Sequence, residues 1–167
     1  MTREPMLRDL ASYLSYLERI RERTLAAIDA IPADRFDWTP RAGEYTIGDL
    51  VRHIASAEQM NVAAALGGGW HYAGHSTEDW GATLADARAK LARVHDESVA
   101  RLTAAGDALL SAKASDLAGN PISAWRILMA LIEHEIDHRS QLDVYLMLLG
   151  VAPPQLFGVK MEALPRD

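Results

Sequence analysis

Residues 124–149, AWRILMALIEHEIDHRSQLDVYLMLL, carry the clearest helical pattern in the chain. Apolar residues and two histidines recur there at spacings of three and four, which places them on one face of an α-helix. These residues are Ile127, Leu131, His134, His138, Leu142, Tyr145 and Leu149. Ser123 stands where an N-cap is needed, and Gly150 followed by Pro153 and Pro154 ends the pattern. We therefore predict a long helix whose core-facing stripe includes both histidines.

Three more segments have helical periodicity and predict helices over residues 5–30, 46–66 and 83–110. Thr46 is a suitable N-cap, and Asp49 three residues later forms a shorter-armed capping box. The intervening segments are rich in Pro and Gly, and no convincing strand alternation occurs. The pattern predicts an all-α protein, a four-helix bundle with a single domain spanning residues 1–167.

Composition excludes several classes of partner and chemistry. The chain has 167 residues, a formal net charge of -6 and no cysteine. An acidic chain offers no basic surface for nucleic acid, so no nucleic-acid partner is expected. Because no apolar stretch has the length of a membrane span or a signal peptide, we expect no membrane contact and a cytoplasmic location. Without cysteine, any sulfur chemistry must come from a substrate.

The two histidines of the last helix form a potential chelate. At positions i and i+4 their Cβ atoms stand about 5–6 Å apart, so both rings can reach one ion at a bond length of about 2.0–2.1 Å. His53 lies on a stripe with Leu50 and Ala57 of the second predicted helix and is a natural third ligand. A lone histidine on an apolar face is more often a hydrogen-bonded core residue, but burying two neighbouring imidazoles without a metal is costly.

Two stretches resemble signatures of the DinB/YfiT-like family. TIGDLVRHIASAEQ, residues 46–59, resembles its helix-two signature, and IEHEIDHRSQLDVYLMLLG, residues 132–150, resembles the HxxxHRxQL signature of its last helix. The WTP motif at residues 38–40 precedes the first stretch in the usual place. The resemblance implies a DinB/YfiT-like four-helix bundle with one divalent metal ion on His53, His134 and His138. Zn, Ni and Fe all suit three imidazoles.

The other histidines have weaker patterns. His71 and His75 lie in the Gly-rich loop and are candidates for lining a pocket, although loop histidines are usually just solvated. His95 stands beside Asp96 and Glu97, and we expect it on the surface.

The sequence does not show whether the charged side chains near the predicted chelate point toward it. Glu133, Glu135 and Asp137 could accept the second ring proton of a ligand, but their helical positions favour solvated or interface roles. Arg139 and Gln141 belong to the signature without an assigned role.

The last helix has a second apolar row, made of Leu128, Ile132, Ile136 and Val144. A helix that is apolar on two sides needs a partner on each, and two-fold dimers are the commonest soluble oligomers. We therefore expect a homodimer.

Family members with known activities are thiol-dependent transferases and a thiol-using isomerase, so the resemblance implies an S-transferase. The expected partners are a low-molecular-weight thiol as co-substrate and a small-molecule electrophile. Two alternatives remain open: a non-catalytic stress-response or ligand-binding protein with a structural metal, and a metal-dependent hydrolase. A hydrolase would need a general base near the metal water. The sequence names no catalytic residue.

Overall fold

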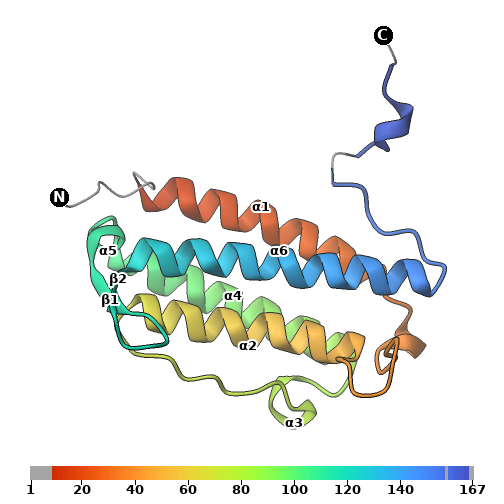
Figure 1. Cartoon of the computed structure of the whole chain (residues 1–167), viewed down its shortest axis with the longest axis horizontal. Coiled ribbons are helices and arrows are strands. Elements are labelled where there is room, and N and C mark those ends of the chain that lie inside the picture. Colours follow the sequence, from red (N-terminus) through yellow and green to blue (C-terminus); the bar gives the residue numbers. More distant parts are fainter. Residues whose placement is uncertain (1–8, 157, 166–167) are drawn as a thin grey trace.

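Four long helices pack together in a bundle in the computed structural model, which describes residues 9–156 and 158–165 (Figure 1). The long helices are α1 (Leu10–Asp29), α2 (Ile47–Ala65), α4 (Leu84–Ala105) and α6 (Ala124–Leu148). The short elements are η1 (Ala33–Arg35), α3 (Thr77–Trp80), α5 (Ala108–Ser111), β1 (Lys113–Ser115), β2 (Pro121–Ser123) and η2 (Met161–Ala163). The predicted all-α four-helix bundle is confirmed.

The helices run in two directions. α1 and α6 run one way, and α2 and α4 run the other way (Figure 1). Because α2 and α4 are parallel, the segment between them must return along the length of the bundle before α4 begins. This crossover segment, residues 66–83, is the long Gly-rich loop of the sequence and contains α3.

Helix ends follow local chemistry. The Thr46 side chain accepts from the Asp49 backbone N–H at 3.0 Å, and Asp49 Oδ2 accepts from the Thr46 N–H at 3.0 Å, so the predicted capping box is present. α1 begins after Asp9, whose carboxylate accepts from the Ser12 N–H at 2.6 Å. The predicted first turn at Pro5 lies outside the described residues.

Two predictions of local structure are wrong. The third long helix was expected to reach residue 110, but it ends at Ala105 because Gly106 adopts a φ of 68°, and α5 follows as a separate short helix. A small antiparallel hairpin, β1 with β2, was not expected at all. It is only three residues per strand, too short to show an alternating pattern. Ser123 does precede α6, but its hydroxyl accepts from Lys113 Nζ and caps no helical N–H.

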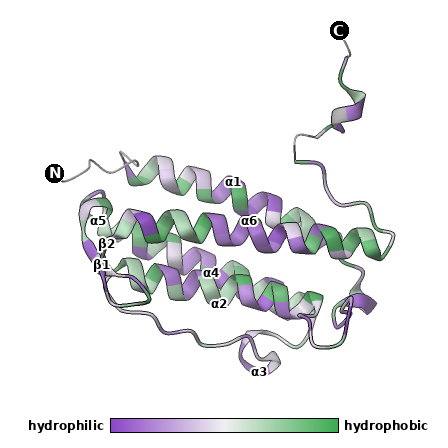
Figure 2. Ribbon diagram, viewed as in Figure 1, coloured by the Kyte–Doolittle hydropathy of each residue, from purple (hydrophilic) through white to green (hydrophobic). Residues whose placement is uncertain are grey.

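The core has two apolar clusters with a polar layer between them. One cluster joins the first half of α1 to α5 and the start of α6, and the other joins the end of α1 to the start of α2 and the end of α6. Figure 2 shows the middle of α6 as hydrophilic and its C-terminal end as hydrophobic. The buried polar and charged side chains are Arg21, Thr24, Arg52, Ser56, Glu58, Asn61, His95, Ser98, Glu135 and Arg139.

Four charged side chains of this layer tie all four long helices together. Arg21 Nη2 of α1 donates to Glu58 Oε2 of α2 at 2.6 Å and to Glu135 Oε2 of α6 at 2.9 Å. His95 Nδ1 of α4 donates to Glu58 Oε1 at 3.0 Å. These four residues, Arg21, Glu58, His95 and Glu135, are called the charge cluster below. Their pairing offsets part of the desolvation that buried charges suffer, although burial still raises the pKa of Glu135 against the effect of the Arg21 charge.

The charge cluster overturns two expectations. His95 was expected on the surface and Glu135 in a solvated or interface position, but their exposed fractions are 6% and 1%. Asp96 and Glu97 beside His95 are exposed, so adjacent residues of one helix face opposite environments.

The second apolar row of α6 is divided between the core and the surface. Leu128 and Ile132 are buried within the chain, and Ile136 packs against the same cluster, so these three need no second copy. Val144 is exposed, as are the neighbouring Met147 and Leu148. The homodimer stays a prediction. None of the described helices combines the length and apolarity needed to cross a bilayer.

The charge cluster predicts a pH dependence of stability. Burial lowers the pKa of His95, but the hydrogen bond and the charge of Glu58 outweigh it and raise that pKa above 6.5. The stabilising pair is therefore fully formed below the unfolded-state pKa and is lost as the pH rises through the folded-state pKa. We expect His95→Gln to lower the free energy of unfolding by about 1.5–3 kcal/mol at about pH 6, with a smaller loss at alkaline pH. Urea unfolding across this range, with the exposed His71→Gln as control, measures the difference. A loss that stays constant with pH would contradict the assignment.

Candidate metal centre

Three imidazole rings converge between α2 and α6. His53 Nε2 lies 3.1 Å from His134 Nε2, which lies 3.1 Å from His138 Nε2. The three residues are half-buried, and each offers one nitrogen to a common point. The structure thus brings together all three histidines that the sequence singled out, through the packing of α2 against α6. These three residues are called the histidine triad below.

The geometry of the histidine triad fits a shared cation. Two nitrogens bound to one ion at about 2.0–2.1 Å with tetrahedral angles stand about 3.3–3.4 Å apart, close to the observed spacing. A neutral imidazole has one N–H, so His134 Nε2 can donate to only one of its two neighbours. The remaining lone pairs would then face each other without a proton. A cation satisfies all three at once.

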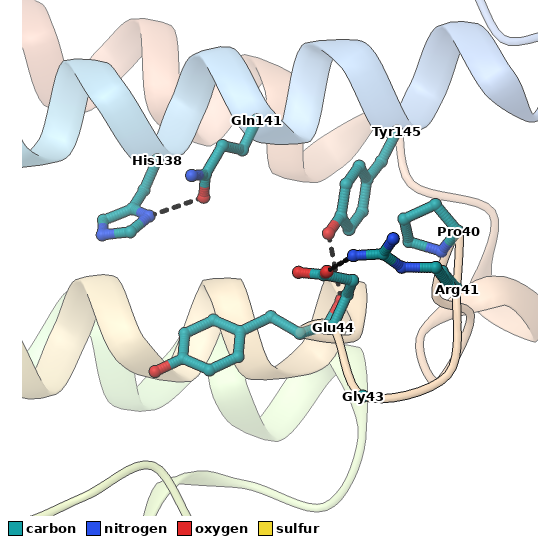
Figure 3. Close-up of a pocket in the computed structure, with 8 residues that line it drawn as sticks. Pro40, Arg41, Gly43, Glu44, His138, Gln141 and Tyr145 are labelled. Atoms are coloured by element: carbon teal, nitrogen blue, oxygen red, sulfur yellow. Dashed lines mark hydrogen bonds and ion pairs between the residues drawn. The ribbon is translucent and has the colours of Figure 1, made fainter.

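Hydrogen bonds to Nδ1, on the outer side of two rings, support an orientation in which each Nε2 faces the centre of the triad. His138 Nδ1 donates to Gln141 Oε1 at 2.8 Å, one turn further along α6 (Figure 3). His53 Nδ1 lies 2.6 Å from the hydroxyl oxygen of Tyr72. When Nδ1 carries the proton, Nε2 keeps its lone pair toward the centre, which is the tautomer a metal requires. Gln141 of the signature therefore has a role that the sequence left open.

Two of the rings, those of His53 and His134, are also in the protonation state that a cation needs. Burial, with repulsion from His138, lowers the pKa of His134 to about 4. Burial, with repulsion from the other rings, lowers the pKa of His53 to about 4 as well. Both imidazoles are therefore neutral at pH 7, and their lone pairs are free for coordination.

The crossover segment contributes aromatic neighbours to the histidine triad. The His75 ring lies 5.8 Å from the His53 ring and 4.8 Å from the Tyr45 ring, between centroids. His75 therefore lies next to the histidine triad, while its role in lining a pocket stays a prediction. His71 is exposed, and none of the described ring contacts of the triad involves it.

A cavity of about 650 Å³ opens beside the histidine triad (Figure 3). Its lining residues are Pro40, Arg41, Gly43, Glu44, Tyr45, His138, Gln141 and Tyr145. The volume is in the range of small-molecule pockets. Tyr145 Oη donates to the Tyr45 carbonyl at 3.2 Å, which holds the loop before α2 against α6. Arg41 and Glu44 pair at the exposed end of the cavity.

Sequence reasoning missed the residues that position the crossover segment. Arg52, one residue before His53, is buried and donates from Nε to the His75 carbonyl at 3.0 Å and from Nη1 to the Gly81 carbonyl at 3.2 Å. The sequence did offer a signal for Arg52, because this charged residue stands within a run of mostly apolar residues. Tyr72 gave no such signal, because its contact to His53 spans a loop without periodicity.

Comparisons with known proteins agree with the fold and the motifs. The DinB superfamily model matches residues 16–142, which is most of the chain. A DinB-like protein of Bacillus cereus has a similar structure, with a TM-score of 0.76, 21% identity, and coverage of 90% of this chain and 99% of that one. A DinB-like protein of Bacillus subtilis has a TM-score of 0.65, 20% identity, and coverage of 83% and 92%. No curated protein matches the sequence. The chain belongs to the DinB superfamily.

Proposed function

We propose that this protein is a metal-dependent transferase that binds one divalent ion through His53, His134 and His138 and conjugates a low-molecular-weight thiol to a small electrophile. The convergence of three imidazoles carries the proposal, because His53 Nε2 and His138 Nε2 each lie 3.1 Å from His134 Nε2. Zn, Ni and Fe are the candidate ions, because neutral imidazoles suit all three. Three protein ligands leave a coordination position for a substrate.

A dication held by three neutral ligands keeps its full charge, so when bound it lowers the pKa of a thiol and favours the thiolate at neutral pH. The chain itself has no cysteine, so the thiol must be a co-substrate. The residues of the protein then have binding and orienting roles. Gln141 and Tyr72 hold two of the ligand rings, and the rings of Tyr45 and Tyr145 offer apolar surface to a substrate in the cavity.

The metal-dependent hydrolase reading has less support. Such an enzyme needs a general base next to the reacting water, which is commonly a carboxylate or an imidazole. Among the described residues, the group of metal-ligating side chains itself contains no Asp or Glu that could serve as this base, and Nδ1 of the neighbouring His75 imidazole is engaged by the Tyr72 hydroxyl. A non-catalytic ligand-binding protein with a structural metal is the remaining alternative, and the second experiment below separates it from the transferase.

The first prediction concerns the metal. Protein purified without a histidine tag should contain about one divalent ion per chain, because the histidine triad offers one site. His134→Ala should weaken binding by more than about 100-fold, beyond the typical effect of outer residues, because His134 is the central member of the triad. Elemental analysis and competition with a chromophoric chelator measure both quantities. His71→Ala is the matched control and should keep full occupancy. Full occupancy in His134→Ala would mean that the triad is misassigned.

The second prediction concerns the thiol. Cobalt-substituted protein should develop a near-ultraviolet sulfur-to-cobalt absorption band on addition of cysteine or glutathione, because the open position accepts a thiol. The zinc, nickel or iron form should also accelerate conjugation of such a thiol to chlorodinitrobenzene, where a carbon–sulfur bond forms, chloride leaves and the thiol proton passes to solvent. His134→Ala should lose both signals. A panel of cellular thiols that gives neither the band nor conjugation would favour the ligand-binding alternative.

A further inference from the structure

The hydroxyl of Tyr72 joins two imidazoles on the outer side of the histidine triad. Its oxygen lies 2.6 Å from His53 Nδ1 and 2.7 Å from His75 Nδ1. We propose that Tyr72 is a positioning residue that holds His53 as an Nε2 ligand and fixes the proton arrangement of His75. The proposal rests on the metal-binding function proposed above and extends it to the crossover segment.

A bound cation fixes the direction of the hydrogen bond between His53 and Tyr72. A metal on His53 Nε2 leaves the proton of that ring on Nδ1, which then donates to the Tyr72 oxygen. Tyr72 has a single hydroxyl proton, and in the proposed arrangement this proton goes to His75 Nδ1, which lies 2.7 Å from the Tyr72 oxygen. His75 must therefore carry its own proton on Nε2. The reverse direction would protonate His53 on Nε2, which excludes the metal.

His53 needs an external positioning group more than the other ligands do. His134 and His138 share α6 at i and i+4, and Gln141 of the same helix holds His138. His53 is the only member of the triad on α2. Tyr72 packs against its ring at 5.5 Å between centroids with an interplanar angle of 73°, and Tyr45 does so at 5.6 Å. The two tyrosines thus confine the ring, and the Tyr72 hydroxyl selects its tautomer.

The crossover segment can hold Tyr72 in place because it is fastened on both sides of that residue. Before it, Trp70 Nε1 donates to the Ser115 carbonyl at 2.7 Å. After it, Arg52 holds the His75 carbonyl, and Trp80 is buried against the second apolar cluster. The Gly-rich crossover segment is therefore fixed to the bundle both before and after Tyr72.

Removal of the Tyr72 hydroxyl tests the proposal. Tyr72→Phe keeps the ring and should lower metal affinity by about 10-fold or more, within the range seen when an outer hydrogen-bond partner of a ligand is lost. Tyr16→Phe is the matched control, since Tyr16 of α1 is 46% exposed against 43% for Tyr72 and contacts no member of the triad in the described structure. His75→Ala, which leaves the hydroxyl as an acceptor for His53, should have a smaller effect. Chelator competition with zinc measures each affinity.

Nitrogen NMR of histidine-labelled zinc protein gives a readout that a merely structural role would not change. In the wild type, His53 should show a slowly exchanging Nδ1–H and His75 a proton on Nε2. In Tyr72→Phe the His53 Nδ1–H should exchange faster, with the thermal unfolding midpoint unchanged because Tyr72 is outside the core. Wild-type affinity and exchange in Tyr72→Phe would overturn the positioning role while the metal site stands. If the wild type binds no zinc, nickel or iron, the metal-binding function fails and the positioning role with it.

Discussion

The contact of Arg21 with Glu58 and Glu135 is the constraint on which the arrangement of the bundle depends. All three groups are almost completely buried, so each charge is stable only where its partner meets it. A sliding of α2 along α6 by one turn would separate the carboxylates from the guanidinium and leave buried charges without partners. Apolar contacts are non-directional, whereas the hydrogen bonds of the charge cluster require defined distances and angles. It therefore sets the axial register of the helices.

That register also creates the histidine triad. His134 is adjacent to Glu135, and His138 is three residues further along α6. On α2, which runs in the opposite direction, His53 precedes Glu58 by five residues, about 7.5 Å along the axis. When Arg21 brings Glu58 and Glu135 together, His53 therefore lies toward the same end of the bundle as His138, and its side chain reaches the rings of both His134 and His138. The same packing of α2 against α6 therefore positions both the charge cluster and the histidine triad.

Helix direction explains why the crossover segment takes part in the site. Two parallel neighbours need a connection as long as the bundle, and here that connection runs alongside α2 (Figure 1). It contacts His53 through Tyr72. Arg52 fastens it from the residue directly before His53, so the position of the segment and the position of the ligand are coupled. The cavity beside His138 lies on the α6 side and is lined by the loop before α2. The histidine triad thus has Tyr72 and His75 on one side, and the cavity beside His138 offers a separate space for a small molecule.

The sequence by itself determined the helices and the members of the histidine triad. The helices are local patterns: the three-to-four spacing predicts a helix and shows which residues share its face, and Thr46 with Asp49 caps α2 through contacts within one turn. His134 and His138 are paired by the same rule. His53 joined the triad through the resemblance of residues 46–59 to a family signature. The burial of His95 and Glu135 escaped prediction, although both occupy apolar-stripe positions, because their polar character suggested solvent. Only the tertiary structure decided that Glu58 pairs with Arg21, 37 residues away, and that Tyr72 reaches His53. Such partners are chosen by the packing of whole helices and by the path of a loop, which no local spacing encodes.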